Sequence, residues 1–159
     1  CLQLLPGKTL KGILRDAVSR WEQFTKTSNT PSLAEQLFGA SADADEKWSG
    51  SVRVSDAVLA EDIRYYLLED KNLVTGLYRS IHATAIEHDT GTAVNKSLRG
   101  IEVVVPVTLY ATLDEAPNAP HKVANWQKTI EQSLGLIQAI GAHRTRGLGR
   151  AVVTLEAKK

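Results

Sequence analysis

The stretch KTLKGILRDAVSRWEQF, residues 8–24, repeats its apolar side chains at alternating intervals of three residues and one. In an α-helix of 3.6 residues per turn, this spacing places those side chains along one face. The pair Pro6-Gly7 is a turn signal, so we expect the helix to begin near Lys8. The apolar face comprises Leu10, Ile13, Leu14, Ala17, Val18 and Trp21. Lys8, Lys11, Arg15 and Glu22 lie away from it.

Further elements follow from local signals along the chain. Ser32 is a good N-cap and Gly39 a good stop signal for a short helix between them. Pro106 interrupts a strand pattern, which indicates an edge or a bulge. The predicted elements are a helix over Leu33–Phe38, a strand over 51–55, strands over Ile81–Ile86 and Leu98–Leu113 joined by the polar segment Glu87–Ser97, a helix from about Lys122 to Ile140 ended by Gly141, and a strand over Ala151–Leu155.

This order of elements predicts an α+β fold of the ferredoxin-like (RRM-like) type with an inserted β-hairpin. We expect a single domain over residues 1–159, because splitting the chain would leave each half with a marginal core. Such a fold normally begins with a strand, and Cys1–Leu5 is barely long enough to form one. The sequence also contains no Met, so we expect the first strand to be missing or truncated here.

Composition excludes several classes of protein. The chain is 43% hydrophobic and 23% charged, unlike a disordered tail, and it has no apolar run of about 20 residues that would span a membrane. The single Cys1 excludes an internal disulfide framework and an intramolecular Cys-based zinc site. No signal-peptide pattern is present, so we expect a cytoplasmic protein without a membrane partner.

The formal net charge of +1 hides an uneven distribution along the chain. Residues 1–26 contain five basic and two acidic side chains, residues 27–71 four and nine, and residues 72–159 ten and seven. The first and last segments are therefore each at +3, and the middle segment is at −5. A polyanion needs locally dense positive charge, which only the two outer segments offer.

The segment Gly141–Arg150, GAHRTRGLGR, is the strongest candidate for an anion-binding loop. It holds three Gly, three Arg and His143, with no acidic residue. Glycines allow close approach to backbone N–H groups, and a guanidinium binds phosphate through two hydrogen bonds. The segment follows a helix and precedes a strand, so it is neither a Walker loop nor a dinucleotide fingerprint. A solvent-facing turn that merely caps the helix is the alternative interpretation.

A second candidate is the start of the first helix, Pro6–Gly12. Two Lys lie in its opening turns, where positive charge opposes the helix dipole. A bound anion would explain their placement, since the N–H groups at a helix N-terminus favour anions. Gly12 lies inside the helix at a cost of roughly 1 kcal/mol relative to Ala, which is typical of a site of close packing or close backbone approach.

Two His residues, His82 and His88, lie close to Glu87 and Asp89. In a strand, residues six apart share one face but lie about 20 Å apart, because the rise is roughly 3.3 Å per residue. We therefore expect no shared metal ion, and a polar hairpin tip explains the segment better. No cofactor is expected elsewhere.

Taken together, five motifs in order make the chain resemble the RAMP superfamily, the repeat-associated proteins of CRISPR systems. They are Pro6–Arg15 for "PG-x-x-LKG-x-x-R", Leu37–Gly39 for "LFG", Gly50–Ala57 for a strand ending in "DA", Ile86–Ala93 with Glu102 for "D-x-x-TG-x-A … E", and Gly141–Arg150 for "G-x-x-R-x-RG-x-GR". The resemblance is closest to the backbone subunits of type III effector complexes. It implies a subunit that holds guide RNA opposite target RNA, contacts other effector subunits and stacks on copies of itself.

The same resemblance implies particular residues. The RNA-binding set would be Lys8, Lys11, Arg15, His143, Arg144, Arg146, Gly147, Gly149 and Arg150, and the hairpin tip His88, Asp89, Thr90 and Gly91 would form a "thumb" that displaces a nucleotide. Glu87 and His88 replace the family's usual Asp-Arg. Family subunits that cut target RNA use an Asp in a loop upstream of the Pro-Gly turn, so the resemblance implies an endoribonuclease only if such a loop precedes the 159 residues. No catalytic residue is therefore assigned.

Two alternatives to RNA holding stay open. One is a metal-independent ribonuclease of the RAMP type that processes or cleaves RNA, with His143, His82 or His88 as acid or base. The other is a small-molecule phosphate binder that uses the Gly-rich loop. RNA cleavage lost on replacing a His would favour the first, and binding of a mononucleotide as well as of an RNA oligomer would favour the second.

Overall fold

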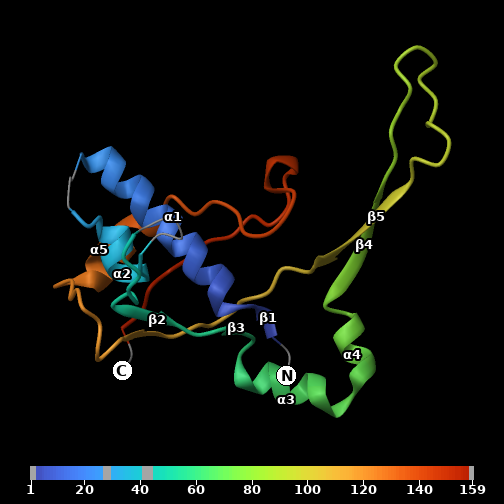
Figure 1. Cartoon of the computed structure of the whole chain (residues 1–159). Helices are drawn as coiled ribbons and strands as arrows, with labels where there is room; N and C mark the ends of the chain where they lie inside the picture. The colour runs from blue at the N-terminus through green and yellow to red at the C-terminus, as the bar shows by residue number, and fades with distance from the viewer. Residues whose placement is uncertain (1–2, 27–29, 41–44, 158–159) are drawn as a thin grey trace. The chain divides into compact units, whose positions relative to one another are not determined.

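The computed structural model describes residues 3–26, 30–40 and 45–157, which form two compact units (Figure 1). The helical unit consists of residues 3–57 and 111–157, and the hairpin unit consists of residues 58–110. Cys1 and the first residues of the predicted opening strand lie outside the described residues. Each unit is described below by itself, and the single domain over 1–159 stays a prediction.

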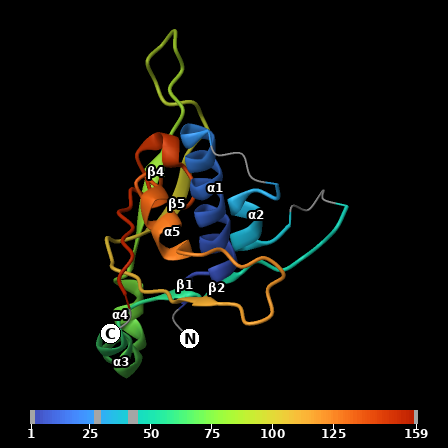
Figure 2. The same cartoon turned by 90° about the vertical axis from the view of Figure 1, so that its left-hand side faces the viewer.

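Helix α1 (Gly7–Thr25) is the centre of the helical unit, as the apolar spacing predicts. Leu10, Leu14, Ala17 and Val18 are buried on one face, while Ile13 and Trp21 are half-buried. Helix α5 (Trp126–Leu134) and helix α2 (Leu33–Phe38) pack against α1, as both views show (Figures 1 and 2). The core between them includes Leu37, Val52 and Ile130, each at most 1% exposed.

Helix α2 confirms its predicted bounds and its Ser32 cap, and it has a further cap that the sequence does not reveal. The Ser32 hydroxyl accepts from the Glu35 N–H, and the Glu35 carboxylate accepts from the Ser32 N–H. The carboxylate of Glu22 on α1 accepts from the N–H groups of Leu33 (2.6 Å) and Ala34 (3.1 Å). Four N–H groups at the start of this six-residue helix, those of Ser32 to Glu35, thereby have acceptors. Glu22 lies off the apolar stripe, yet it is only 6% exposed.

Three glycines of the sequence motifs allow close backbone packing. A Cβ on Gly7 would lie 2.7 Å from the carbonyl oxygens of Val54 and Ser55. Gly39 has a φ of +96°, and a Cβ there would lie 3.1 Å from the nitrogen of Gly50. A Cβ on Gly50 would collide with the carbonyl oxygen of Leu37. Any side chain at these positions would force backbone apart, so these motif glycines have a packing function within the chain.

The strands in the described residues form three two-stranded sheets. β1 (Gln3–Leu5) pairs with β3 (Ala57–Val58), so a short opening strand is present. β2 (Val52–Val54) pairs antiparallel with β6 (Leu113–Glu115), with Arg53 opposite Asp114. In the hairpin unit, β4 (Tyr78–Ala83) pairs antiparallel with β5 (Arg99–Val104), with Ile81 opposite Ile101. The fold class is therefore mixed α/β with small antiparallel sheets.

The hairpin unit also contains two helices, α3 (Glu61–Glu69) and α4 (Lys71–Thr75). The antiparallel strands β4 and β5 overlap the two predicted strands, but β4 ends at Ala83 rather than Ile86, and the predicted strand over Leu98–Leu113 ends at Val104, two residues before Pro106. Proline has no N–H for the ladder, which accounts for the early end. No helix among the described ranges is long and apolar enough to cross a membrane.

The C-terminal part of the helical unit differs from the prediction. α5 begins at Trp126 rather than near Lys122, because Asn125 adopts a left-handed φ of +55°. It ends at Leu134, after which the N–H groups of Leu136 and Ile137 bond three residues back in tight turns. The predicted strand over Ala151–Leu155 is wrong, because those residues pair with no strand in the described part of the chain. The preceding Arg150 forms a single bridge to Ala139.

Candidate nucleic-acid interface

A basic stripe runs along α1. Lys8, Lys11, Gly12 and Arg15 follow the i, i+3, i+4, i+7 spacing of one helix face, which borders the buried face, so that Lys11 and Arg15 are half-buried. Gly12 is exposed, and a Cβ there would meet no described atom within 4 Å. Internal packing therefore does not explain Gly12, and its backbone is open to solvent between the basic side chains.

The N-terminus of α1 already faces an anion from within the chain. The Gly7 N–H donates to Oδ1 of Asp56 at 2.6 Å. Asp56 belongs to the "DA" motif and Gly7 to the "PG" motif, so the two motifs bind each other. Asp56 supplies the negative charge that the helix N-terminus favours, so no RNA phosphate is needed at this position. The interface on α1 consequently depends on the side chains of the basic stripe.

The three cations of the stripe are not equally available. The Nη1 group of Arg15 donates a hydrogen bond to the carbonyl oxygen of Ala40, with 3.4 Å between the nitrogen and the oxygen, and this bond partly fixes the guanidinium. Lys8 is exposed and Lys11 half-buried, and neither makes a hydrogen bond or an ion pair with another described residue. Lys8 and Lys11 are therefore the groups on α1 that are free to bind a phosphate.

The Gly-rich loop forms a separate, closed structure after α5. The Ile140 N–H donates to the Gly149 carbonyl oxygen (2.7 Å) and the Ala151 N–H to that of Gln138 (3.1 Å), which ties the two ends of the loop together. Gly141, Gly147 and Gly149 have φ values of +95°, +79° and +71°, a region that favours glycine. A Cβ on Gly149 would collide with the carbonyl oxygen of Ile140. These glycines shape the loop.

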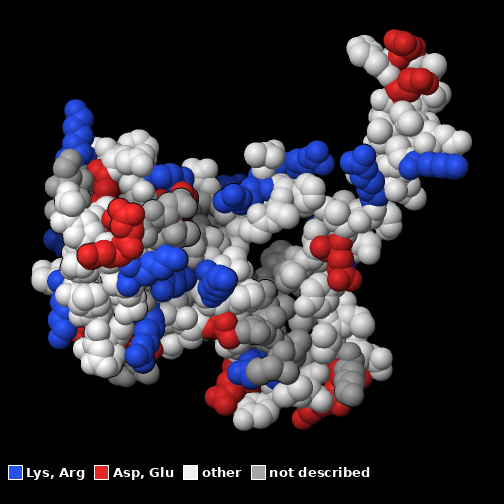
Figure 3. Space-filling view, in the orientation of Figure 1, with Lys and Arg blue, Asp and Glu red and all other residues white. Residues whose placement is uncertain are grey.

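The loop presents its basic side chains to solvent. A short 3₁₀ helix, η1 (Arg144–Arg146), begins after His143, which has a left-handed φ of +57°. His143, Arg144, Arg146 and Arg150 are all exposed. None of their side chains makes a hydrogen bond or an ion pair with any residue in the described ranges. Figure 3 shows Lys and Arg side chains over this part of the molecule.

Helix α1 and the stem of the loop lie side by side. The Nη2 group of Arg20 donates a hydrogen bond of 3.0 Å to the carbonyl oxygen of Leu136. The guanidinium of Arg20 also forms an ion pair with Asp16. Since α1 rises 1.5 Å per residue, Lys8 lies about 18 Å along the helix from this contact. The two predicted basic segments thus belong to one unit, although Arg20 lies on a different face of α1 from the stripe.

The predicted thumb residues lie in the turn of the β4–β5 hairpin. The Gly91 N–H donates to the Glu87 carbonyl oxygen and the Glu87 N–H to that of Thr92, both at 2.9 Å. The Thr90 hydroxyl donates to a carboxylate oxygen of Glu87 at 2.8 Å, so Glu87 helps to hold the turn. His88, Asp89, Thr90 and Gly91 are all exposed. The sequence prediction missed the apolar side chains of this region, Ile86 and Leu98, which are 68% and 70% exposed.

The three candidate acid–base His residues are not brought together by a shared element. His82 lies on β4 opposite Gly100, His88 lies in the hairpin turn, and His143 belongs to the helical unit. Among the described residues, no cluster of three or more His, Cys, Asp or Glu side chains could hold a metal ion. No described acid or base lies within hydrogen-bond reach of the His143 side chain.

Comparison with known proteins agrees with the motifs. The family model described as the RAMP superfamily matches residues 3–152, which span both units and all five motifs. No curated protein matches the sequence. Because the family match covers nearly the whole chain, this protein belongs to the RAMP superfamily of CRISPR-associated proteins.

Proposed function

We propose that this protein is an RNA-binding subunit of a type III CRISPR effector complex. In this proposal it holds the sugar-phosphate backbone of the guide RNA opposite the target RNA, contacts other effector subunits and stacks on copies of itself in antiviral defence. The fold would be the ferredoxin-like fold of its family. Base pairing by the guide would supply sequence specificity, so the protein needs to contact only backbone.

The loop Gly141–Arg150 is the observation that supports this proposal best. Three guanidiniums are exposed, and the described residues supply no acidic partner for any of them. Added Cβ atoms at Gly141 and Gly147 would meet no described atom within 4 Å, and the ends of the loop are tied together by two hydrogen bonds. A loop that only capped α5 would not need three uncompensated positive charges. The basic stripe on α1, in the same unit, supplies further positive charge for an extended polyanion.

The β4–β5 hairpin is proposed as the thumb. Its turn is polar and fully exposed, and apolar side chains flank it at Ile86 and Leu98. Exposed aliphatic side chains on a narrow ribbon can insert beside a base and separate it from its neighbour. This arrangement supports a thumb that displaces a nucleotide.

The geometry supports RNA holding better than RNA cleavage. A mechanism that uses a separate general acid and general base needs two such groups at the scissile bond, and no described acid or base lies within hydrogen-bond reach of His143. A small-molecule phosphate binder that uses the loop alone is the other alternative, and binding of a mononucleotide as well as of an RNA oligomer would support it. RNA processing is therefore an outcome to be tested on the isolated protein, by incubating it with repeat RNA and looking for cleavage that His143→Ala abolishes.

The proposal is tested by replacing Arg144 and Arg146 together with Ala. We expect the affinity for single-stranded RNA to fall at every sequence tested. The slope of log K against log salt should shrink by about 1.4, since each lost phosphate contact removes roughly 0.7 for a single strand. Fluorescence anisotropy over 50–200 mM salt measures both quantities.

The matched control is Lys122→Ala with Lys128→Ala, which removes two exposed positive charges from the same unit outside the loop. Its RNA affinity and salt slope should stay close to those of the unmodified protein. Equal losses in both double variants would mean that only net charge matters. Unchanged binding in the Arg144/Arg146 variant would contradict the proposal.

A further inference from the structure

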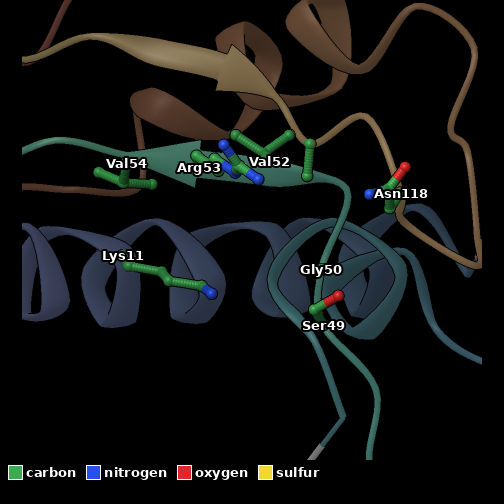
Figure 4. Close-up of a pocket in the computed structure, with 8 residues that line it drawn as sticks. Lys11, Ser49, Gly50, Val52, Arg53, Val54 and Asn118 are labelled. Atoms are coloured by element: carbon green, nitrogen blue, oxygen red, sulfur yellow. The ribbon is translucent and has the colours of Figure 1, made fainter.

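A pocket of about 450 Å³ lies in the helical unit between α1 and β2, away from the Gly-rich loop in sequence. Figure 4 shows Lys11 of α1 and Arg53 of β2 on two sides of it, with Ser49 and Asn118 toward one end. Gly50, Val52, Val54 and Ala116 complete the set of lining residues. The four polar side chains thus come from three segments far apart in the sequence.

The chemistry of this lining is that of an anion site. It combines an ammonium, a guanidinium, a hydroxyl and a carboxamide, and it contains no carboxylate. Neither Lys11 nor Arg53 makes a hydrogen bond or an ion pair with another described residue. Lys11 is half-buried and Arg53 is exposed, and both charges would attract an anion that enters the hollow.

The acidic residue opposite Arg53 in the β2–β6 ladder does not neutralise it. Asp114 lies directly opposite Arg53 on the antiparallel β2–β6 ladder, a position from which opposite charges commonly pair. The two side chains nevertheless form no ion pair within 4 Å. Arg53 therefore remains available to a ligand although a carboxylate is its cross-strand neighbour.

We infer that this pocket binds a phosphate group, with Lys11 and Arg53 as the charged ligands and Ser49 and Asn118 as neutral hydrogen-bonding groups. This inference rests on the proposed function, because a phosphodiester of bound RNA is the expected source of the phosphate. A volume of about 450 Å³ has room for a phosphate with its attached ribose. Arg53 then extends the basic stripe of α1 across to β2, and Arg53 is a phosphate ligand that the sequence motifs did not suggest.

The test compares four variants of the full chain: Lys11→Ala, Arg53→Ala, Asp114→Asn and the control Lys128→Ala. For binding of two unrelated single-stranded RNA oligomers, Lys11→Ala and Arg53→Ala should each lower the affinity equally for both sequences. Each should also reduce the salt slope by about 0.7. Asp114→Asn removes a neighbouring negative charge and should raise the affinity. Lys128→Ala should change neither quantity.

A second arm uses inorganic phosphate, titrated into the same variants by calorimetry, to separate the sources of the anion. If Arg53→Ala matches Lys128→Ala on RNA but abolishes phosphate binding, the pocket takes free phosphate. If Arg53→Ala matches Lys128→Ala in both arms while Arg144→Ala with Arg146→Ala still weakens RNA binding, the pocket inference is overturned and the proposed function stands. If the unmodified protein binds no RNA, the proposed function fails and the phosphate arm alone decides on the pocket.

Discussion

The packed motifs of the helical unit differ from the motif in the turn of the hairpin unit in what their residues contact. In the helical unit, the motifs around Gly7, Gly39, Gly50 and Asp56 contact one another and are explained by packing. In the hairpin unit, only Leu59, Leu67 and Leu77 are buried apolar residues among those described, and the residues of the turn are exposed. Motif residues that contact each other build the fold, whereas exposed motif residues without an internal partner are the ones that point to an external ligand.

The largest expected effect is on the free energy of unfolding, when a buried leucine and an exposed leucine are each replaced with Ala. Leu37 is fully buried between α1, α2 and β2, and Leu98 is 70% exposed near the hairpin turn. Leu37→Ala should lower the free energy of unfolding by about 2–5 kcal/mol, because the cavity does not refill. Leu98→Ala should change it by less than about 0.5 kcal/mol. Urea denaturation followed by circular dichroism measures both, and similar losses would contradict the contrast.

A smaller loss is expected at Glu22. Replacing it with Ala leaves the N–H groups of Leu33 and Ala34 without their acceptor. Since hydrogen bonds to a charged group contribute about 1.5–3 kcal/mol, Glu22→Ala should destabilise by roughly that amount. Glu22→Gln keeps one acceptor oxygen and should lose less. The order of the two variants in urea midpoints is the measurement, and an equal loss would mean that the cap contributes little.

The smallest loss is expected at Asp56, which is exposed although it caps α1. Asp56→Ala should cost about 1 kcal/mol, as is usual when an N-cap acceptor is removed. Glu156→Ala, at an exposed position in the C-terminal segment, is the control and should be neutral. Thermal unfolding distinguishes the two. A neutral Asp56→Ala would show that the contact between the two motifs does not stabilise the fold.

The sequence predicts those elements whose causes lie in neighbouring residues, and it does not predict those that depend on residues far apart in the chain. Helices α1 and α2 follow from apolar spacing and from Ser32 and Gly39, which are local features. Glu22 could not be found in this way, because its partners lie 11 and 12 residues away and its own helix position suggests solvent. The early end of α5 and the unpaired segment 151–155 depend on tertiary context that no local pattern contains.

The same distinction applies to the residues of the candidate site. The Gly-rich loop and the stripe of Lys8, Lys11 and Arg15 were predicted because each lies in one continuous segment. Arg53, Ser49 and Asn118 reach one pocket from separate segments, and only the packing of β2 beside α1 brings them together. The strand alternation at 51–55 was a usable hint, since it predicts Arg53 on the face opposite the buried Val52.

The hydrogen bonds that join Gln138 to Ala151 and Ile140 to Gly149 have a consequence for the thermodynamics of binding. Fixing one backbone residue costs about 1–2 kcal/mol of conformational entropy, so a free ten-residue loop would lose much of its binding energy on becoming ordered. Here that cost is met when the chain folds. On meeting a polyanion, the loop Gly141–Arg150 has to immobilise little more than the side chains of three arginines.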